Sequence, residues 1–355
     1  MNTYYINGGG TTELTNCVMD LINGATSYIK TGNFLFQDET VINTLHNTMR
    51  KGIPLFIISN LRDPEESGGR RRSNSEEINV DMHLPYLDDL RREGAHCHFL
   101  DELHAKFIII DGTQGLLMSA NYAPNSLGRN IETGILLGAD ETKDLEFVFD
   151  KLYMNADIQH FEYRHDQKHV RRKTNLIPEG TFDNINSKLR LTISSPDING
   201  NQSRTNLAKC RVTSIYESII GIIAAAEDFV FIVSWHFRAL ERLPRLMRAV
   251  QSALNRGVKI YLYSNTQGIS ASLRESLDAI DQLKALGCES YGDDNNHSKC
   301  VLNEKDGIIF TANIDGVHGM TTGFEVGCML SKDQHLEVLN HVISLVQKQN
   351  SNNNE

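Results

Sequence analysis

The sequence of 355 residues lacks the features of secreted, membrane and metal-binding proteins. No apolar run approaches the ~20 residues that a membrane helix needs, and the N-terminus MNTYYINGGG has neither the basic start nor the apolar stretch of a signal peptide. The six cysteines form no CxxC pair, and no Cys/His spacing resembles a zinc site. We therefore expect a cytoplasmic protein with free thiols and with no membrane segment, metal or other cofactor.

Positive charge is also scarce in this chain. Thirty-five Lys and Arg residues stand against 45 Asp and Glu residues, which gives a formal net charge of −10. Composition alone would therefore not select a nucleic-acid binder. Hydrophobic residues at 40% and charged residues at 23% are typical of a soluble globular protein, and the length allows one large domain or two ordinary ones.

What the sequence does contain is an internal repeat. The matching pairs are His104–Asp111 with His297–Glu304, Ser119-Ala-Asn121 with Thr311-Ala-Asn313, and Ile131-Glu132-Thr-Gly134 with Phe324-Glu325-Val-Gly327. The spacing from His to Glu is 28 in both copies (132 − 104 and 325 − 297). A lone His-x-Lys pair carries little information, but a repeat with matched downstream residues indicates one ancestral unit present twice.

The repeat extends upstream and predicts two tandem α/β units. Each copy reads strand–helix–strand–helix–strand–helix, then a hairpin that holds the motif, then a closing helix. The helices that we expect are 11–24, 39–51, 84–93 and 141–154 in the first copy and 211–225, 239–256, 270–287 and 333–348 in the second. The boundaries that we expect are 1–155 for the N-terminal unit, 156–185 for a connector, and 186–355 for the C-terminal unit with a frayed tail from 347.

Each motif should form one end of a β-hairpin. Side chains two residues apart on a strand share a face, so His104 and Lys106 should project together, as should His297 and Lys299. The turn pattern at 111–115 predicts a hairpin that returns a hydroxyl and an amide towards the first pair. Pseudo-two-fold packing of two similar units would then bring the two clusters face to face.

The residue types of this composite site suit a phosphodiester. Ammonium and amide donors hold phosphoryl oxygens, while one imidazole attacks phosphorus and the other protonates the leaving oxygen. These roles need one neutral and one protonated ring, so the two pKa values must be split around 6.5. A carboxylate on the far ring nitrogen would orient each histidine. The expected composite site holds no adjacent carboxylate cluster of the kind that binds Mg²⁺ or Ca²⁺.

The two motifs resemble those of the phospholipase D superfamily, whose signature is H-x-K-x4-D followed by Ser or Thr and Asn. The first copy matches in full, whereas the second has Glu304 in place of the Asp and is one residue shorter between His and Asn. The resemblance covers nearly the whole chain. It implies two α/β sandwich units, packed as a pseudo-two-fold dimer with one composite active site, and a two-step, metal-independent reaction through a phosphohistidine.

The resemblance also assigns residues to roles. Glu132 and Glu325 fit the carboxylate that orients the histidine in the nuclease branch of the superfamily, and Asp111 and Glu304 are expected to support their hairpins rather than take part in chemistry. The catalytic set is His104, His297, Lys106, Lys299, Asn121, Asn313, Glu132 and Glu325, and the supporting set is Ser119, Thr311, Asp111 and Glu304. We take His104 as the nucleophile because its motif is the more regular.

Three further groups have a functional and a structural interpretation. Arg70, Arg71 and Arg72 lie in a loop that the second copy lacks, and we expect them to bind substrate as a clamp on a nucleic-acid backbone. The stripe at Arg238, Arg242, Arg245 and Arg248 fits a phosphate-tracking surface and a solvated helix face equally well. Trp235 and His236 end an apolar strand, and we assign them to core packing rather than to the cleft.

Our first hypothesis is a DNA nuclease, with a helicase or antiviral defence protein as the partner that family analogy implies. The alternatives are a phospholipase D or phosphatidyltransferase acting on phospholipids, and an inactive binding module of a larger complex. An aromatic content of only 7% argues against a lipid entry surface. The sequence leaves three properties open: whether the substrate is DNA or RNA, whether it is single- or double-stranded, and whether cleavage is internal or at an end. Both half-sites lie in one chain, so a homodimer is not needed to build the site.

Overall fold

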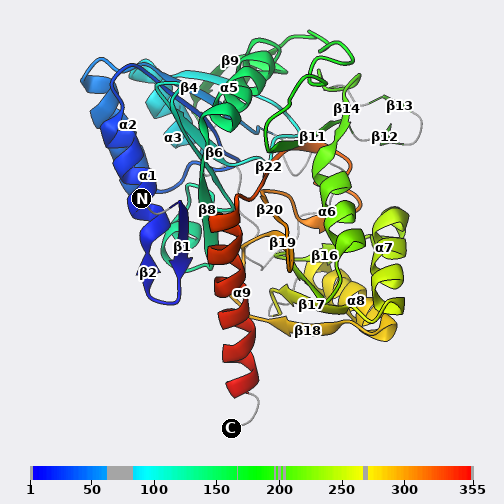
Figure 1. The fold of residues 1–355 in the computed structure, drawn as a ribbon. Coiled ribbons are helices and arrows are strands. Elements are labelled where there is room, and N and C mark those ends of the chain that lie inside the picture. Colours follow the sequence, from blue (N-terminus) through cyan, green and yellow to red (C-terminus); the bar gives the residue numbers. More distant parts are fainter. Residues whose placement is uncertain are drawn as a thin grey trace.

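The computed structural model describes residues 3–61, 83–165, 167–195, 197–198, 201–202, 205–266 and 271–352. The chain folds into two similar units that lie side by side, the first coloured blue to green and the second green to red (Figure 1). A ten-stranded sheet in the order β10-β9-β5-β4-β3-β6-β7-β8-β1-β2 forms the first unit, and an eight-stranded sheet in the order β14-β11-β22-β20-β19-β15-β17-β18 forms the second. The α/β class predicted from the repeat is therefore confirmed.

The first unit follows the predicted alternation of strands and helices. Its elements are β1 (Tyr4–Gly8), β2 (Thr11–Thr12), α1 (Glu13–Gly24), β3 (Ile29–Gly32), α2 (Glu39–Arg50), β4 (Leu55–Ser59), α3 (Leu84–Arg92), β5 (His96–Phe99), β6 (Phe107–Ile110), β7 (Gln114–Met118), α4 (Pro124–Gly128), β8 (Glu132–Leu137), α5 (Ala139–Met154), β9 (Ile158–Arg164) and β10 (Gln167–Arg172). Strands β3, β4 and β5 are parallel, and β6 and β7 form the expected antiparallel hairpin.

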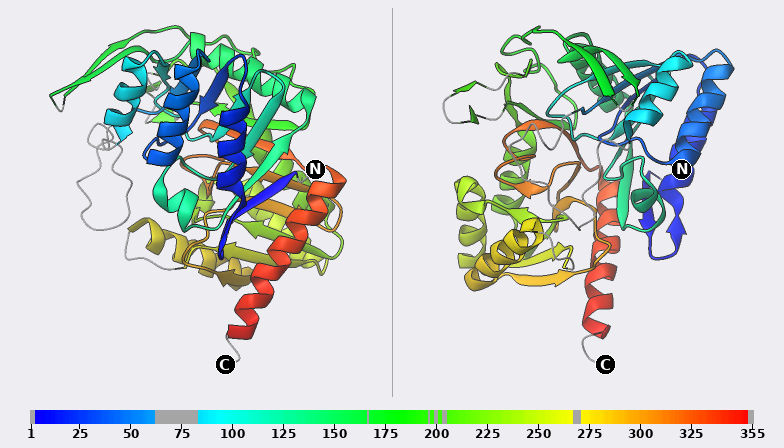
Figure 2. Two further views of the ribbon diagram at one scale, coloured as in Figure 1. Left: turned by 90° about the vertical axis from the view of Figure 1, so that its left-hand side faces the viewer. Right: turned by 180° about the vertical axis from the view of Figure 1, so that it is seen from behind.

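The second unit repeats this order. Its elements are β11 (Leu189–Ser194), β12 (Asp197–Ile198), β13 (Asn201–Gln202), β14 (Arg211–Thr213), α6 (Ser214–Ala225), β15 (Phe229–Val233), β16 (Phe237–Arg238), η2 (Leu240–Arg242), α7 (Pro244–Asn255), β17 (Lys259–Ser264), α8 (Ala271–Leu286), β18 (Glu289–Gly292), β19 (Cys300–Asn303), β20 (Gly307–Phe310), β21 (Ile314–Asp315), β22 (Gly323–Met329) and α9 (Lys332–Asn352). Figure 2 shows the two units from the side and from behind.

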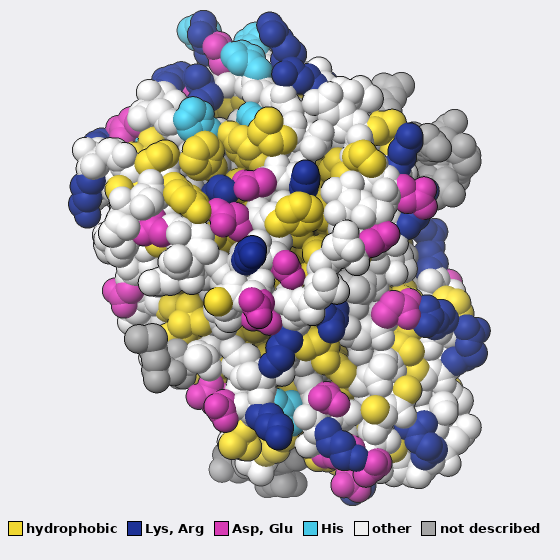
Figure 3. Space-filling model, turned by 45° about the horizontal axis from the view of Figure 1, so that its top comes forward, with side chains coloured by type: hydrophobic (Ala, Val, Ile, Leu, Met, Phe, Trp, Pro, Cys, Tyr) yellow, Lys and Arg dark blue, Asp and Glu magenta, His cyan; other side chains and the backbone are white. Residues whose placement is uncertain are grey.

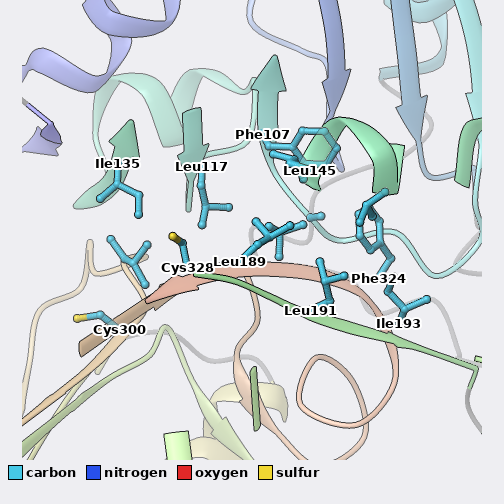
Figure 4. Close-up of a cluster of buried hydrophobic side chains, with 14 of the residues drawn as sticks. Phe107, Leu117, Ile135, Leu145, Leu189, Leu191, Ile193, Cys300, Phe324 and Cys328 are labelled. Carbon is cyan, nitrogen blue, oxygen red and sulfur yellow. The ribbon is translucent and has the colours of Figure 1, made fainter. Parts of the chain in front are cut away.

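Three cores hold these layers together. Helices α1, α2 and α3 cover one face of the first sheet, and α6, α7 and α8 cover one face of the second. The other faces of the two sheets, with α5 and α9, share a single central core. Figure 4 shows this core, in which Leu117 and Ile135 of the first sheet point towards Leu189 and Cys328 of the second. The two units are thus joined by apolar burial rather than by a tether alone.

Two segments differ from the expectation. Helix α9 continues to Asn352, where we had expected fraying from residue 347, because Val346 still packs on the central core and extending a formed helix costs little. The segment 156–185, expected to be a connector, contributes β9 and β10 to the edge of the first sheet. Both strands continue the sheet beyond β5, where Ile158 pairs with Phe99.

Candidate active site

Both motifs lie at the start of the hairpins that carry them. His104 and Lys106 immediately precede β6, and His297 and Lys299 precede β19. The carbonyl of Lys106 accepts a hydrogen bond from the backbone N–H of Met118 at 3.1 Å, and the carbonyl of Lys299 accepts the equivalent bond at 3.2 Å. The hairpin ladder therefore extends through each lysine, which fixes the direction of its side chain.

Each histidine is held by a glutamate of the opposite unit. Nδ1 of His104 lies 2.7 Å from Oε1 of Glu325, and Nδ1 of His297 lies 2.8 Å from Oε1 of Glu132. The exchange is reciprocal, as expected for a pseudo-two-fold arrangement. Neither half-site is complete without the other unit.

Backbone hydrogen bonds between the units create this exchange. The N–H groups of His104 and Ala105 donate to the carbonyl of Phe324 at 3.1 and 3.0 Å, and that of His297 donates to the carbonyl of Ile131 at 3.0 Å. Phe324 and Ile131 directly precede the two glutamates in the sequence. Pairing the chain at this point places each carboxylate beside the histidine of the other unit.

A hydroxyl group holds the second oxygen of each carboxylate. Ser119 donates to Oε2 of Glu132, and Thr311 donates to Oε2 of Glu325. Burial alone would raise the pKa of both glutamates, but the facing imidazole and a neighbouring lysine outweigh it and hold each pKa below its ordinary value. Both carboxylates are therefore ionised and fixed, and Ser119 and Thr311 act on the histidines only through them.

The two lysines are fully buried cations. Nζ of Lys106 donates to the carbonyl of His104, and Nζ of Lys299 donates to that of His297 at 2.6 Å. Burial lowers the pKa of Lys106 to about 7 and that of Lys299 to about 8, although the two glutamates oppose the shift. An anionic ligand would stabilise the charged form of both groups.

The two histidines differ in their surroundings. Burial lowers the pKa of His104 to about 4, against the opposing charge of Glu325, and burial also lowers the pKa of His297. The side chain of His104 is 31% exposed, whereas that of His297 is 11% exposed. The pseudo-symmetric site is thus unequal, with His104 the more accessible ring.

The two asparagines of the motifs are buried with unsatisfied groups. Within the described ranges, Oδ1 of Asn121 and Oδ1 of Asn313 have no hydrogen-bond partner. Such a group costs free energy until a partner is supplied. Their position in the motifs makes a bound ligand the natural partner.

Asp111 and Glu304 lie at the hairpin turns and not beside the histidines. The Asp111 carboxylate accepts hydrogen bonds from the backbone N–H groups of Thr26, Ser27 and Tyr28 at 2.7–2.9 Å and from the hydroxyl of Thr26. Glu304 accepts the N–H of Glu227 at 2.9 Å, at the equivalent turn of the second unit. Both carboxylates tie the hairpin turn to the loop before the central strand.

Two aromatic side chains lie beside the histidines, one of them unnoticed in the sequence and the other assigned to the core. The Phe34 ring lies 5.3 Å from that of His104, and the Trp235 ring lies 5.4 Å from that of His297. Both are half-buried, and each follows the strand β3 or β15 at the same position of the repeat. The assignment of Trp235 to the core is therefore wrong, because its strand ends before it and leaves the indole against His297. An aligned aromatic at this position in both copies was the signal that could have revealed Phe34.

Two arginines of the predicted stripe form ion pairs. Arg245 of α7 pairs with Glu217, as a solvated helix face would show. Arg238 pairs with Glu275 at 2.5 Å, but it lies in β16, opposite Asp315, and so is not part of a helix face. Arg70, Arg71 and Arg72 lie outside the described residues. His236, assigned to the core with Trp235, lies 3.5 Å from the Asp315 carboxylate with only 12% of its side chain exposed.

The comparisons with known proteins agree with this geometry. Residues 18–153, which carry the first motif, match the family model described as cardiolipin synthase, PLD-like domain. The resemblance drawn from the motifs is therefore confirmed for residues 18–153, which match a PLD-like domain. The comparison with curated proteins found no match.

Solved structures extend the likeness to both units. Phosphatidylserine synthase from Haemophilus influenzae Rd KW20 is 11% identical, with a TM-score of 0.62 over 98% of this chain and 85% of that chain. Polyphosphate kinase from Porphyromonas gingivalis is 14% identical, with a TM-score of 0.55 over 95% of this chain. This chain spans about half (49%) of the length of that kinase. At such identities the likeness shows the fold alone, and this fold spans both units.

Three negative observations complete the description, and they concern only the residues that the structure describes. No group of three His, Cys, Asp or Glu side chains is arranged to hold a metal ion. None of the described helices combines the length and the apolarity needed to cross a membrane. All six cysteines are buried free thiols, as expected.

Proposed function

We propose that this protein is a metal-independent phosphodiesterase that cleaves nucleic acid, with DNA as the first candidate substrate, through a phosphohistidine intermediate. One observation carries the proposal: Nδ1 of each imidazole lies 2.7 or 2.8 Å from a buried carboxylate of the opposite unit, and in His104 the two atoms are hydrogen-bonded. A hydrogen-bonded Nδ1 fixes the tautomer and leaves Nε2 for nucleophilic or acid–base chemistry. Six buried thiols suit a reducing compartment, so we place the reaction in the cytoplasm.

In the proposed first step, Nε2 of His104 attacks the phosphorus atom. The low pKa of His104, about 4, keeps the ring neutral at neutral pH, and the ring is the more accessible of the two. The bond between phosphorus and the leaving oxygen breaks as the P–N bond forms, and His297 donates its proton to that oxygen. The bound anionic diester favours the protonated form of His297 that this step needs.

In the proposed second step, His297 acts as the base. The neutral ring takes a proton from water, the water oxygen attacks phosphorus, and the P–N bond to His104 breaks. Lys106, Lys299 and the two asparagine amides hold the non-bridging oxygens in both steps. In this role the amide N–H groups donate to the phosphoryl oxygens, while the buried Oδ1 atoms of Asn121 and Asn313 stay available to a donor of the substrate or to water.

The preference for nucleic acid over phospholipid follows from the carboxylates. The resemblance to the nuclease branch placed a glutamate behind each histidine, and Glu132 and Glu325 occupy those positions. A helicase or defence-system partner, expected by analogy, stays a prediction. The phospholipid alternative is tested in the same experiment, which includes a phospholipid substrate.

The test is a substrate panel in EDTA. Purified protein is incubated with plasmid, single-stranded DNA, RNA, phosphatidylcholine and bis(p-nitrophenyl) phosphate, and we expect cleavage of nucleic acid and of the small diester without added metal. His104→Asn and His297→Asn should each lower turnover by about 10²-fold or more. A strict Mg²⁺ requirement would contradict the mechanism, and cleavage of phosphatidylcholine alone would favour the phospholipid alternative.

A substrate whose leaving group needs no proton distinguishes the roles of the two histidines. p-Nitrophenolate leaves without a proton, so His297→Asn should still form a phosphorylated protein from the small diester, detected by intact mass after acid-free quenching. His104→Asn should form none. The opposite pattern would exchange the roles of the two rings, and adduct formation by neither variant would show that both histidines act in the first step.

A further inference from the structure

The ribbon formed by β9 and β10 is an addition to one unit only. β9 joins the edge of β5 where Ile158 pairs with Phe99, and β10 pairs with β9 up to Gln167 opposite Arg164. In the second sheet, β18 takes the place of β5 and is the last strand. None of the strands described for the second unit continues that sheet, so the pseudo-symmetry of the molecule is broken here.

The base of the ribbon is fixed to both units. Phe161 is buried, and its ring lies 5.0 Å from that of Phe99. The Asp157 carboxylate accepts hydrogen bonds from the backbone N–H groups of Asp101 at 3.0 Å and Asn206 at 2.6 Å. These contacts hold the ribbon as part of the folded core rather than as a loose linker.

The outer part of the ribbon is strongly basic although the chain is acidic overall. Residues 158–173 contain the basic side chains Arg164, Lys168, Arg171, Arg172 and Lys173, the histidines His160, His165 and His169, and the acidic side chains Glu162 and Asp166. Lys, Arg and His side chains gather along the upper edge of the molecule over these strands (Figure 3). The chain as a whole carries −10, so this surface is an exception.

Strand alternation places the cations on the outward face. Arg171 pairs with His160, and Arg164 pairs with Gln167, on the face opposite that of buried Phe161. Arg164 and Arg171 are exposed, and so is Lys173 just beyond the strand. The same face also carries Glu162, whose carboxylate lies 2.8 Å from the Arg164 guanidinium and offsets part of its charge. The excess of positive charge remains, and these exposed side chains contribute nothing to the core.

The ribbon is rooted close to His104. The Arg172 guanidinium lies 2.6 Å from the Asp101 carboxylate. Asp101 precedes His104 by three residues, so the Cα atoms of these two residues are at most about 11 Å apart. Nζ of Lys168 lies 3.5 Å from the carbonyl of Leu61, just beyond the end of β4. Lys168 itself lies on the face of Phe161, since it pairs with Tyr163. These two contacts therefore fix the base of the ribbon, from which Arg171 and Lys173 project outward, at the end of the sheet that carries His104.

We propose that the outward face of the β9–β10 ribbon binds the sugar-phosphate backbone of the nucleic-acid substrate and leads it to His104. This inference rests on the proposed function. Lys and Arg neutralise backbone phosphates without regard to sequence, and repulsion from the acidic remainder of the protein is screened beyond ~8–10 Å at physiological salt. A local cationic surface next to the site thus allows an acidic protein to bind a polyanion.

The experiment removes three charges from this face. Arg164→Gln, Arg171→Gln and Lys173→Gln are combined in the full chain, and binding of a fluorescent single-stranded oligonucleotide is followed by anisotropy in EDTA on a His104→Asn background. We expect at least about a tenfold loss of affinity at 0.1 M salt and a salt slope shallower by about 2 (~0.7 per phosphate contact). The ratio of DNA cleavage to cleavage of bis(p-nitrophenyl) phosphate should fall in parallel in the chain that keeps His104.

A matched triple variant removes the same charge elsewhere. Arg242→Gln, Arg245→Gln and Arg248→Gln affect exposed side chains of η2 and α7, and should leave the salt slope within about 0.5 of the parent. Equal losses in both triples, or none in the ribbon triple, would overturn the inference while leaving the cleavage result intact. Loss of binding to phosphatidylglycerol vesicles without loss of oligonucleotide binding would show a membrane contact instead. Absence of any cleavage by the parent would refute the proposed function separately.

Discussion

At the scale of single residues, the site holds buried positive charge that Glu132 and Glu325 stabilise only in part. Lys106 and Lys299 are buried, and burial lowers their pKa values to about 7 and 8. Two cations in a dry site repel each other and lose hydration. A bound phosphoryl group, as proposed above, would supply further negative charge, so its binding would be coupled to lysine protonation.

This coupling predicts a pH dependence for anion binding. Tungstate keeps its charge over this pH range, and its affinity, measured by calorimetry, should fall as pH rises above about 8, by up to tenfold per pH unit for each proton that must be taken up. Lys106→Met should weaken binding and flatten the profile. In the ligand-free protein the free energy of unfolding should instead rise from pH 7 to 10, because the unfolded chain then binds more protons than the folded one. A pH-independent affinity would contradict the lowered lysine pKa values.

At the scale of single elements, the hairpin turn depends on Asp111. Its carboxylate accepts four hydrogen bonds from Thr26, Ser27 and Tyr28, and its φ of 54° lies in the left-handed region that Asp and Asn tolerate better than most residues. The motif residue thus joins the hairpin to the start of β3. Nothing in its contacts links it to the phosphoryl site.

We therefore expect Asp111→Ala to affect stability and not chemistry. The free energy of unfolding in urea should fall by about 1–3 kcal/mol, since the donors of Thr26, Ser27 and Tyr28 lose a charged acceptor and the left-handed conformation is retained at a cost. Turnover per folded molecule should stay within about twofold. Asp111→Asn keeps an acceptor and the tolerance of positive φ, and should cost less. A large loss of turnover with unchanged stability would assign Asp111 to the reaction.

The periodic patterns predicted the elements well, because they reflect local physics. Helix α2 begins after Asp38, whose carboxylate accepts the N–H groups of Thr40 and Val41, and it ends at Arg50, within a residue of the predicted end. Strands β9 and β10 were not predicted as part of the sheet, since their polar sequence carries no buried face of its own. Only the edge of β5 and the contact of Phe161 with Phe99 make them part of the fold.

At the scale of the whole molecule, the central core makes one cooperative body of two units. Leu191 of β11 is 1% exposed, and in Figure 4 its side chain lies in the core between the two sheets, with Phe107 of the first. The units bury the same apolar surface against each other, so neither keeps its core without the other. The crossed pairing of histidines and glutamates depends on this contact.

Leu191→Ala should therefore destabilise both units together. We expect a loss of about 2–5 kcal/mol in the free energy of unfolding, through lost burial and the cavity left behind. Calorimetry should still show a single transition. Leu176→Ala, at a side chain that is 43% exposed, is the control and should change stability by about 0.5 kcal/mol or less. Two separate transitions in the variant would show that the units fold independently.

The sequence by itself determined the repeat, the α/β class and the chemical groups of both half-sites, since these follow from periodicity and from matched spacing along the chain. It contains His104, Lys106 and Glu132 as one copy of a motif, and nothing local shows that Glu132 serves His297 instead. Tertiary structure alone decided that exchange, the place of Phe34 and Trp235 beside the rings, and the nearness of the basic ribbon to His104. The physical reason is that these contacts depend on how two buried faces dock, and docking joins residues far apart in the chain.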